Sequence, residues 1–281
     1  MNFKSYAQLT RDVRAWSDQL PTDIVAVAGV PRSGLIPAAQ LALLRNIHLV
    51  TLDDLRGGRR PWQKQLRRGV PAQPNKTRVL VVDDTVDRGV TLRGISSELC
   101  GDCDVSYGAV YYRKKLPEIV DYAYEHLPHP RIFEWNLFHC AQLRRCCVDM
   151  DGVLCEDWVA VEQDSGDGLA RYLEHLKNAK PLFPCTMPMY AVVTARLEKY
   201  RRETEAWLTR HGVKYGKLVM SPHDTAAERR KASDHVIRKA EFFAANPAAQ
   251  LFIESSKHQA SSIHKISGKP ALCSTTMELF S

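Results

Sequence analysis

The sequence of 281 residues lacks long hydrophobic runs, and its longest apolar stretches have only the length of a strand. A helix that crosses a membrane needs about 20 consecutive apolar residues. No signal peptide is apparent in the first residues either. We therefore expect no membrane partner and a cytoplasmic protein.

The cysteines lack the spacing of a secreted disulfide framework. Cys100 and Cys103 form one C-x-x-C pair and Cys146-Cys147 a doublet, but no second pair stands at the spacing of zinc ligands. We expect reduced, partly buried thiols. The composition, 44% hydrophobic and 25% charged, is typical of a soluble globular protein, and the length suits two domains.

Acidic residues are absent between Asp54 and Asp83, although the net charge of the chain is only +7. Glycine and proline are frequent in this stretch, which predicts an irregular loop. A basic loop could bind nucleic acid. We favour a second interpretation, in which the loop closes over a polyphosphate leaving group and excludes water. Its basic residues are Arg56, Arg59, Arg60, Lys64, Arg67, Arg68, Lys76 and Arg78.

The most informative stretch is residues 79–92. Four apolar residues, 79–82, predict a buried parallel strand. Asp83 and Asp84 come at its carboxyl end, where ligands bind in open α/β sheets. Residues 87–91 form a turn that runs into a helix, and the backbone N–H groups of such a turn suit a phosphate dianion. Carboxylates beside a phosphate cradle suit a sugar phosphate, because carboxylates accept hydrogen bonds from ribose hydroxyls.

This stretch resembles the phosphoribosyl-pyrophosphate (PRPP) loop of the type I phosphoribosyltransferases. The resemblance implies that Asp83 and Asp84 bind the ribose 2′ and 3′ hydroxyls. It also implies that the loop wraps the 5′-phosphate and that Asp87 is a catalytic residue. Arg88 departs from the family, which usually has Thr or Ser there; an arginine could add a charge-assisted bond to phosphate or crowd the loop. The loop residues assigned to substrate binding are Arg88, Gly89, Val90 and Thr91, with Asp87 before them.

The pattern around this loop predicts strands at 24–28, 47–52 and 105–112, which alternate with helices at 5–18, from 34 to about 44, and at 90–100. Such alternation favours a parallel sheet with right-handed crossovers. The turn at 29–34 resembles the family's pyrophosphate loop, in which Arg32 and Ser33 would bind substrate. Residues 131–136 resemble a hydrophobic-Glu-Trp segment near the base site of purine-type members, or they form a plain edge strand.

The pattern restarts after about residue 140. A strand that ends in Asp149-Met150-Asp151-Gly152 resembles motif I of the haloacid dehalogenase-like (HAD) phosphatases. Alternation along a strand places Asp149 and Asp151 on the same side. One carboxylate can attack phosphorus while the other protonates the leaving oxygen. A magnesium ion would screen the carboxylates from the incoming phosphate.

Three later segments follow the same family order. Thr194 ends a strand and matches motif II, and Lys239 matches motif III, with Lys231 as its competitor. Glu254 matches motif IV, although Ser255 stands where the family often has a second acid. The resemblance implies that Thr194 and Lys239 are catalytic, and that Asp149, Asp151 and Glu254 hold the metal. Only about forty residues separate motifs I and II, too few for a large cap.

The sequence thus predicts an α/β protein of two domains, each a parallel sheet flanked by helices. Residues 1–142 would form a phosphoribosyltransferase-like domain, and residues 143–281 a HAD-like phosphatase domain with a minimal cap. The implied substrates are PRPP, a nucleobase and a phosphomonoester, with Mg²⁺ as cofactor. Dephosphorylation could convert the nucleotide product into a nucleoside. Alternatively, the first domain is a PRPP or nucleotide sensor that controls the phosphatase. The sequence leaves open whether the chain forms a homodimer, and it does not favour a nucleic-acid partner.

Overall fold

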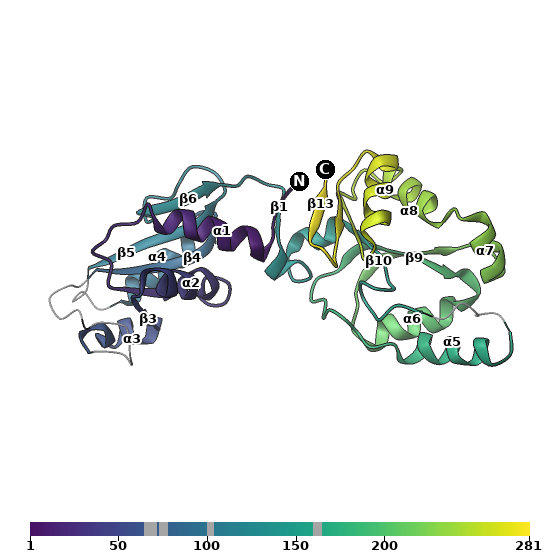
Figure 1. Ribbon diagram of the computed structural model, residues 1–281, viewed down its shortest axis with the longest axis horizontal. Coiled ribbons are helices and arrows are strands. Elements are labelled where there is room, and N and C mark those ends of the chain that lie inside the picture. The colour runs from purple at the N-terminus through teal and green to yellow at the C-terminus, as the bar shows by residue number, and fades with distance from the viewer. Residues whose placement is uncertain (65–71, 73–77, 100–103, 160–164) are drawn as a thin grey trace. The chain divides into compact units, whose positions relative to one another are not determined.

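The computed structural model describes residues 1–64, 72, 78–99, 104–159 and 165–281. It divides into two compact units: the first unit is Asn2–Arg131, and the second unit is Ile132–Ser281 together with Met1. Each unit contains a sheet flanked by helices (Figure 1), which confirms the α/β expectation for both halves. The expected boundary between residues 142 and 143 stays a prediction about which segments fold on their own.

The first unit contains a five-stranded sheet in the order β3-β2-β4-β5-β6, and all neighbouring strands are parallel. A capping box between Ser5 and Gln8 starts the first helix. The strands are β1 (Asn2–Lys4), β2 (Ala26–Gly29), β3 (His48–Val50), β4 (Val79–Val86), β5 (Val105–Tyr112), β6 (Tyr122–His126) and, at the boundary, β7 (Arg131–Phe133). The helices are α1 (Tyr6–Ser17), α2 (Leu35–Arg45), α3 (Leu52–Arg56), α4 (Val90–Glu98) and the 3₁₀ turn η1 (Pro61–Gln63).

Strand β4 is longer than the sequence predicts. It continues beyond Val82 to Val86, because Asp83 and Thr85 pair with Ala109 and Tyr111 of β5. The two carboxylates therefore lie within the strand rather than after it. Several residues with sequence-based assignments, namely Arg67, Arg68, Lys76, Cys100 and Cys103, lie outside the described part of the chain.

The second unit contains a six-stranded sheet in the order β10-β9-β8-β11-β12-β13, parallel except for the last strand. Its strands are β8 (Cys146–Val148), β9 (Met189–Leu197), β10 (Tyr215–Ser221), β11 (Leu251–Glu254), β12 (Ala271–Cys273) and β13 (Glu278–Phe280). Its helices are α5 (Gly166–Asn178), α6 (Arg201–Arg210), α7 (Ala226–Ala232), α8 (His235–Ala244) and α9 (Lys257–Ser267), with the 3₁₀ turns η2 (Glu134–Asn136), η3 (Ala141–Arg145) and η4 (Glu198–Tyr200).

The strand expected to end at Thr194 continues to Leu197, and helix α6 begins at Arg201. Strand β9 runs to Leu197 because that residue pairs with Ser221 of β10, and the turn η4 follows it. The cysteines described here, Cys140, Cys146, Cys147, Cys155, Cys185 and Cys273, are free thiols. Among the described residues, no helix is both long and apolar enough to cross a membrane.

Candidate active sites

In the first unit, the loop between β2 and α2 lies directly against β4. Val30 donates a backbone hydrogen bond of 2.8 Å to the Val82 carbonyl. A Cβ atom at Gly34 would lie only 2.6 Å from that same carbonyl oxygen, so the close approach requires glycine. The peptide bond between Pro31 and Arg32 is cis. At the end of this loop the Ser33 hydroxyl donates a 2.8 Å hydrogen bond to Asp84 Oδ1.

The adjacent carboxylates of β4 lie in different surroundings. Asp84 is 2% exposed and is reached by Ser33, whereas Asp83 is half-buried and lines a cavity of about 270 Å³. The Asp84 backbone N–H donates to Asp83 Oδ1 at 2.9 Å. Burial and the neighbouring Asp84 carboxylate raise the pKa of Asp83 to about 8. Asp83 can therefore hold a proton near neutral pH and still offer an acceptor oxygen.

The loop after β4 forms the rest of that cavity. Gly89 precedes α4 with a positive φ of 72°, a backbone conformation that glycine adopts without strain. Helix α4 then begins at Val90, which leaves the N–H groups of its first turn available for an anion. The cavity is lined by Asp83, Thr85, Val86, Asp87, Arg88, Gly89, Val90, Thr91 and Leu92. The structure thus brings together the residues assigned to the 5′-phosphate, while Arg32 is exposed on the neighbouring loop.

Sequence reasoning missed the partner of Asp87. Arg113, directly after β5, contacts the Asp87 carboxylate at 2.6 Å. Burial opposes ionisation of Asp87, but the hydrogen bond from Arg113 outweighs it and lowers the pKa of Asp87. The position of Arg113 at the end of a parallel strand was the available signal, because such strand ends meet at one edge of the sheet. A second cavity of about 480 Å³ here is lined by five cations, two acids and two apolar residues: Arg88, Arg93, Arg113, Lys114, Lys115, Asp87, Glu118, Leu116 and Pro117.

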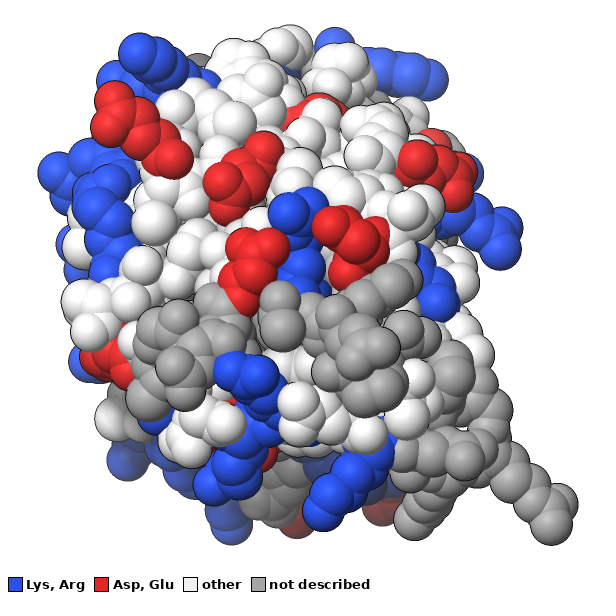
Figure 2. Space-filling view, turned by 90° about the vertical axis from the view of Figure 1, so that its left-hand side faces the viewer, with Lys and Arg blue, Asp and Glu red and all other residues white. Residues whose placement is uncertain are grey.

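The described part of the basic stretch is largely ion-paired. Arg56 contacts Asp53 and Glu98, and Arg59 contacts Asp54, all within 2.9 Å. Figure 2 shows acidic side chains among the basic ones on this face of the first unit. Surface pairs of this kind are screened by solvent and stabilise little. They do reduce the positive charge that a nucleic acid would meet.

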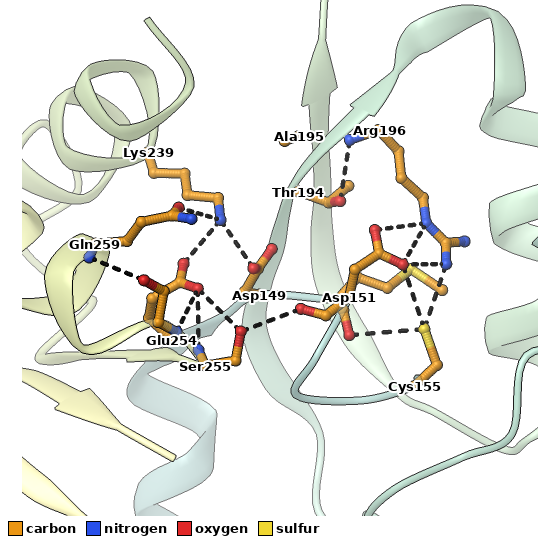
Figure 3. Close-up of polar contacts among 12 residues, drawn as sticks. Asp149, Asp151, Cys155, Thr194, Ala195, Arg196, Lys239, Glu254, Ser255 and Gln259 are labelled. Atoms are coloured by element: carbon orange, nitrogen blue, oxygen red, sulfur yellow. Dashed lines mark hydrogen bonds and ion pairs between the residues drawn. The ribbon is translucent and has the colours of Figure 1, made fainter. Parts of the chain in front are cut away.

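In the second unit, Asp149 follows β8 and is 6% exposed. The Lys239 ammonium, on α8, contacts Asp149 Oδ2 at 2.8 Å and Glu254 Oε2, at the end of β11, also at 2.8 Å (Figure 3). Burial and the charge of Glu254 raise the pKa of Asp149, whereas the ion pair and hydrogen bond with Lys239 oppose this rise and favour the ionised carboxylate. The structure places Lys239 at this carboxylate, whereas its competitor Lys231 is exposed on α7.

Asp151 has a different counter-ion, which sequence reasoning did not assign. The Arg196 guanidinium, 1% exposed, donates to both carboxylate oxygens of Asp151, with Nε at 3.1 and 2.9 Å (Figure 3). Burial opposes ionisation, but the Arg196 charge outweighs it and holds the pKa of Asp151 well below its usual range. The Thr194 hydroxyl oxygen accepts a hydrogen bond of 3.1 Å from the backbone N–H of Arg196. Arg196 shares a strand face with Thr194, and that spacing was the available signal.

The turn after Asp151 is closely packed against the residue that follows β11, Ser255. Gly152 has a φ of 78°, and a Cβ atom there would lie 2.5 Å from Ser255 Oγ. The backbone N–H groups of Ser255 and Ser256 donate to Glu254 Oε1 at 2.9 and 3.3 Å. These contacts fix the Glu254 carboxylate, which shares the Lys239 ammonium with Asp149.

The three carboxylates assigned to a metal do not form a metal site as they stand. Among the described residues, no group of three or more His, Cys, Asp or Glu side chains is placed to hold a metal ion. Lys239 stands between Asp149 and Glu254, and both Asp151 oxygens face Arg196. The assignment of Mg²⁺ to Asp149, Asp151 and Glu254 therefore stays a prediction.

These groups nevertheless share one cavity of about 370 Å³. Its acidic end holds Asp149, Asp151 and Glu254, with Lys239 between two of them. The Thr194 backbone continues into Ala195, which lines the same cavity. The remaining lining residues are Asp157, Trp158, Tyr172, Arg229, Arg230, Ser233, His235, Ser255, Ser256 and Gln259. A buried carboxylate next to a fixed ammonium, facing an open cavity, is an arrangement that can attack an electrophile such as phosphorus.

Comparison with known proteins finds relatives of the N-terminal half of the chain. No protein-family model matches the chain. It is 35% identical over 118 residues to the xanthine-guanine phosphoribosyltransferase of Chromohalobacter salexigens, across 42% of this chain and 71% of that protein. Among solved structures, a purine phosphoribosyltransferase from Pyrococcus horikoshii shows 23% identity and a TM-score of 0.36, covering 48% of this chain and 92% of its own. The Helicobacter pylori xanthine-guanine-hypoxanthine phosphoribosyltransferase shows 18% identity over the same shares, also with a TM-score of 0.36. Through its N-terminal half, the chain belongs to the phosphoribosyltransferase family.

Proposed function

We propose that the first unit transfers a phosphoribosyl group from PRPP to a purine base. The observation that carries this proposal is the cavity in which Asp83 and the loop 87–91 come together. Its carboxylate suits ribose hydroxyls, and its helix N-terminus suits a phosphate. The purine follows from the name of the Chromohalobacter relative, a xanthine-guanine phosphoribosyltransferase.

In this reaction a ring nitrogen of the base attacks ribose C1 and pyrophosphate leaves. Asp83 and Asp84 hold the ribose, and the N–H groups near Gly89 and Val90 hold the 5′-phosphate. Arg113 keeps Asp87 ionised, so Asp87 can accept the proton that the base loses. Arg32 and Ser33 face the departing pyrophosphate. Magnesium would enter with PRPP, because Mg²⁺ binds substrate phosphates in such sites.

The test is incubation of the full chain with PRPP, Mg²⁺ and a panel of bases, with mass detection of products. We expect a nucleotide, or its nucleoside, from guanine, xanthine or hypoxanthine. Formation of no product from any base would support the second candidate, a PRPP or nucleotide sensor. Arg88 is the observation that favours the sensor, because the family has a small hydroxyl residue there and Arg88 lines the phosphate cavity.

For the second unit we propose hydrolysis of a phosphomonoester, as its likeness to the HAD phosphatases implies. The supporting observation is the contact of buried Asp149 with Lys239. Asp149 attacks phosphorus and the alcohol leaves, which gives an aspartyl phosphate. Water then cleaves that intermediate and releases inorganic phosphate. Lys239 neutralises the nucleophile and the phosphoryl oxygens, and Thr194 binds one of them.

Asp151 is proposed to move the protons of both steps. The pairing with Arg196 favours its ionised form, which suits the second step, where a carboxylate accepts a proton from water. Protonation of the leaving alcohol in the first step requires that Asp151 first gain a proton. A kcat that falls from acid toward neutral pH would support this role for Asp151, and a flat profile would contradict it.

The two activities would be coupled if the second unit hydrolyses the nucleotide made by the first. A nucleoside would then accumulate and draw the reversible transfer forward. What supports coupling is that the two units belong to one chain. Direct assay of phosphate release from the nucleotide, compared with other phosphomonoesters, tests it.

A further inference from the structure

The cavity of the second unit has room for more than a phosphoryl group. Its volume of about 370 Å³ lies in the range of pockets that take a whole small molecule. Asp149, Lys239 and Glu254 line its acidic end, and two aromatic side chains, Trp158 and Tyr172, line another part of its wall. The leaving group of a phosphomonoester must lie in the space beyond the phosphoryl group, where these rings can contact it.

Trp158 belongs both to the core and to the cavity wall. It is partly buried and packs against a hydrophobic cluster that includes Tyr172, Leu176 and Tyr200. Its ring meets that of Tyr172 edge-on, with the centroids 5.2 Å apart and the planes at 65°. The ring of His175 lies 5.3 Å away, tilted by 52°. Neither of these two neighbours uses the parallel, offset arrangement that a planar ligand ring would take on the indole.

His175 shows how close the indole lies to the reacting groups. Its Nε2 atom is 3.9 Å from Asp151 Oδ1, and its ring contacts the indole of Trp158. One imidazole ring therefore separates the indole from the Asp151 carboxylate. In a nucleoside monophosphate, one sugar separates the phosphate from the base. A molecule of that size can place its phosphate at Asp149 and a planar ring at Trp158.

The wall at Trp158 suits a nucleobase. Bases stack on aromatic side chains through their π faces, and the interaction tolerates different bases because each base has such a face. The sugar of a phosphomonoester has no π face. A stacking wall would therefore distinguish nucleotides from sugar phosphates that have the same phosphate and the same leaving alcohol.

We propose that the indole of Trp158 stacks on the base of a nucleotide, so that the second unit prefers nucleoside monophosphates to sugar phosphates that lack a base. The proposal rests on the proposed phosphomonoester hydrolysis and names its substrate class. Tyr172 acts as a positioning residue, because its edge-on contact orients the indole. The nucleotide proposed as the product of the first unit belongs to this substrate class.

The test compares guanosine 5′-monophosphate with ribose 5-phosphate, which share the phosphate and the leaving alcohol and differ in the base. Phosphate release by the full chain with Mg²⁺ gives kcat/KM for each, and their ratio measures the preference. We expect the ratio to favour the nucleotide and to fall by roughly tenfold in Trp158→Leu, as for other losses of base stacking. Trp158→Phe keeps an aromatic face and should lose less. Phe183→Leu, which changes an exposed aromatic residue outside this cavity, is the matched control and should leave the ratio unchanged.

A wild-type chain without preference would overturn the proposal. So would a ratio that Trp158→Leu leaves unchanged, even if both kcat/KM values fell, because the indole would then serve only the hydrophobic cluster. Equal falls in Trp158→Leu and Trp158→Phe would contradict stacking.

Failure of the proposed hydrolysis is distinguishable from failure of the stacking. If the wild-type chain hydrolyses neither probe, the hydrolysis is wrong, and calorimetric titration with guanosine 5′-monophosphate then tests Trp158 alone. Binding in the first unit contributes equally to both chains. Weakening or loss of a second binding site in Trp158→Leu would still support stacking, and identical isotherms for the wild-type chain and Trp158→Leu would overturn it.

Discussion

Both units place two carboxylates near the carboxyl edge of a parallel sheet, but they balance the charge differently. In the first unit, burial and the Asp84 carboxylate raise the pKa of Asp83, and the hydroxyl of Ser33 binds Asp84. In the second unit, a buried cation contacts each carboxylate: Lys239 at Asp149 and Arg196 at Asp151. The first arrangement suits neutral hydroxyl donors. The second brings its own counter-ions and suits a reaction at an anionic phosphoryl group.

The largest expected effect comes from removing the proposed nucleophile of the second unit. Asp149→Asn keeps the shape of the side chain but removes the attacking charge. We expect phosphomonoester turnover to fall on the order of 10⁴-fold or more, as for other nucleophile knockouts. Transfer from PRPP should continue, since Asp149 belongs to the other unit. Phosphate release and nucleotide formation are measured on the same preparation.

The same variant decides whether the units act in sequence. If they are coupled, Asp149→Asn accumulates a nucleotide where the wild-type chain forms a nucleoside. Identical final products from both chains would show that the second unit acts on another phosphomonoester. Asp157→Asn, which changes another acid of the same cavity, is the matched control.

Chelation of divalent cations is expected to affect the activities of the two units to different degrees. The rate of transfer from PRPP should fall in EDTA by roughly two orders of magnitude or more, because EDTA removes the metal that neutralises the phosphates. Phosphomonoester hydrolysis should fall less, because Lys239 already stands between Asp149 and Glu254. Mg²⁺ titration of both activities checks this. An equal loss of both would mean that the carboxylates rearrange around the metal that the sequence assigns to them.

The comparison also shows what the sequence could predict. Local patterns identify the elements, because buried runs of apolar residues predicted the strands; Asp149 does follow its strand, whereas Asp83 and Asp84 lie within theirs. The order of motifs also predicted that Thr194, Lys239 and Glu254 belong near Asp149, and the structure brings Asp149, Lys239 and Glu254 into contact. Membership of the phosphoribosyltransferase family is confirmed for the N-terminal half.

The counter-ions were not predictable in the same way. Arg113 and Arg196 were visible in the sequence, but their partners Asp87 and Asp151 lie 26 and 45 residues away. Which of many cations meets a given carboxylate depends on tertiary packing, not on local spacing. The end of β4 was also misplaced, since its continuation to Val86 depends on pairing with β5. Long-range pairing thus determines the electrostatics that distinguish the two units.

Removing the buried arginine should destabilise the second unit. Arg196→Met leaves Asp151 without its counter-ion, and breaking a buried pair in this way costs about 3–5 kcal/mol. We expect faster hydrogen exchange of backbone amides in β8 and β9, with little change in β2 and β4. Arg201→Met is the control, because Arg201 pairs with Glu198 and Glu205 at the surface and such pairs contribute about 1 kcal/mol or less. Equal effects of the two substitutions would contradict the role of Arg196.

A smaller effect is expected at the carboxylates of the first unit. Asp83→Asn and Asp84→Asn each replace a carboxyl group that is proposed to accept a hydrogen bond from a ribose hydroxyl. The affinity for PRPP should fall by about 1–3 kcal/mol for each lost bond. Calorimetric titration with PRPP and Mg²⁺ measures it, and Asp53→Asn, which changes an exposed carboxylate of helix α3, serves as control. Unchanged affinity in the double variant would show that PRPP does not bind at this strand.

The pH dependence of stability should be the most subtle difference between the units. The pKa of Asp83 is raised to about 8 in the folded chain, whereas an unfolded aspartate titrates near about 3.9. Between these values the folded state holds a proton that the unfolded state has lost, so the stabilisation is complete at low pH and is lost as the pH rises toward 8. We therefore expect amides of β4 to exchange with smaller opening free energies at about pH 8 than at about pH 5, after correction for intrinsic exchange rates. Asp83→Asn should flatten this dependence, because it removes the titrating group. Glu118→Gln, which changes an exposed carboxylate of the same unit, should leave the slope in place. A slope that persists in Asp83→Asn would assign the proton to another group and remove the electrostatic contrast between the two carboxylate pairs.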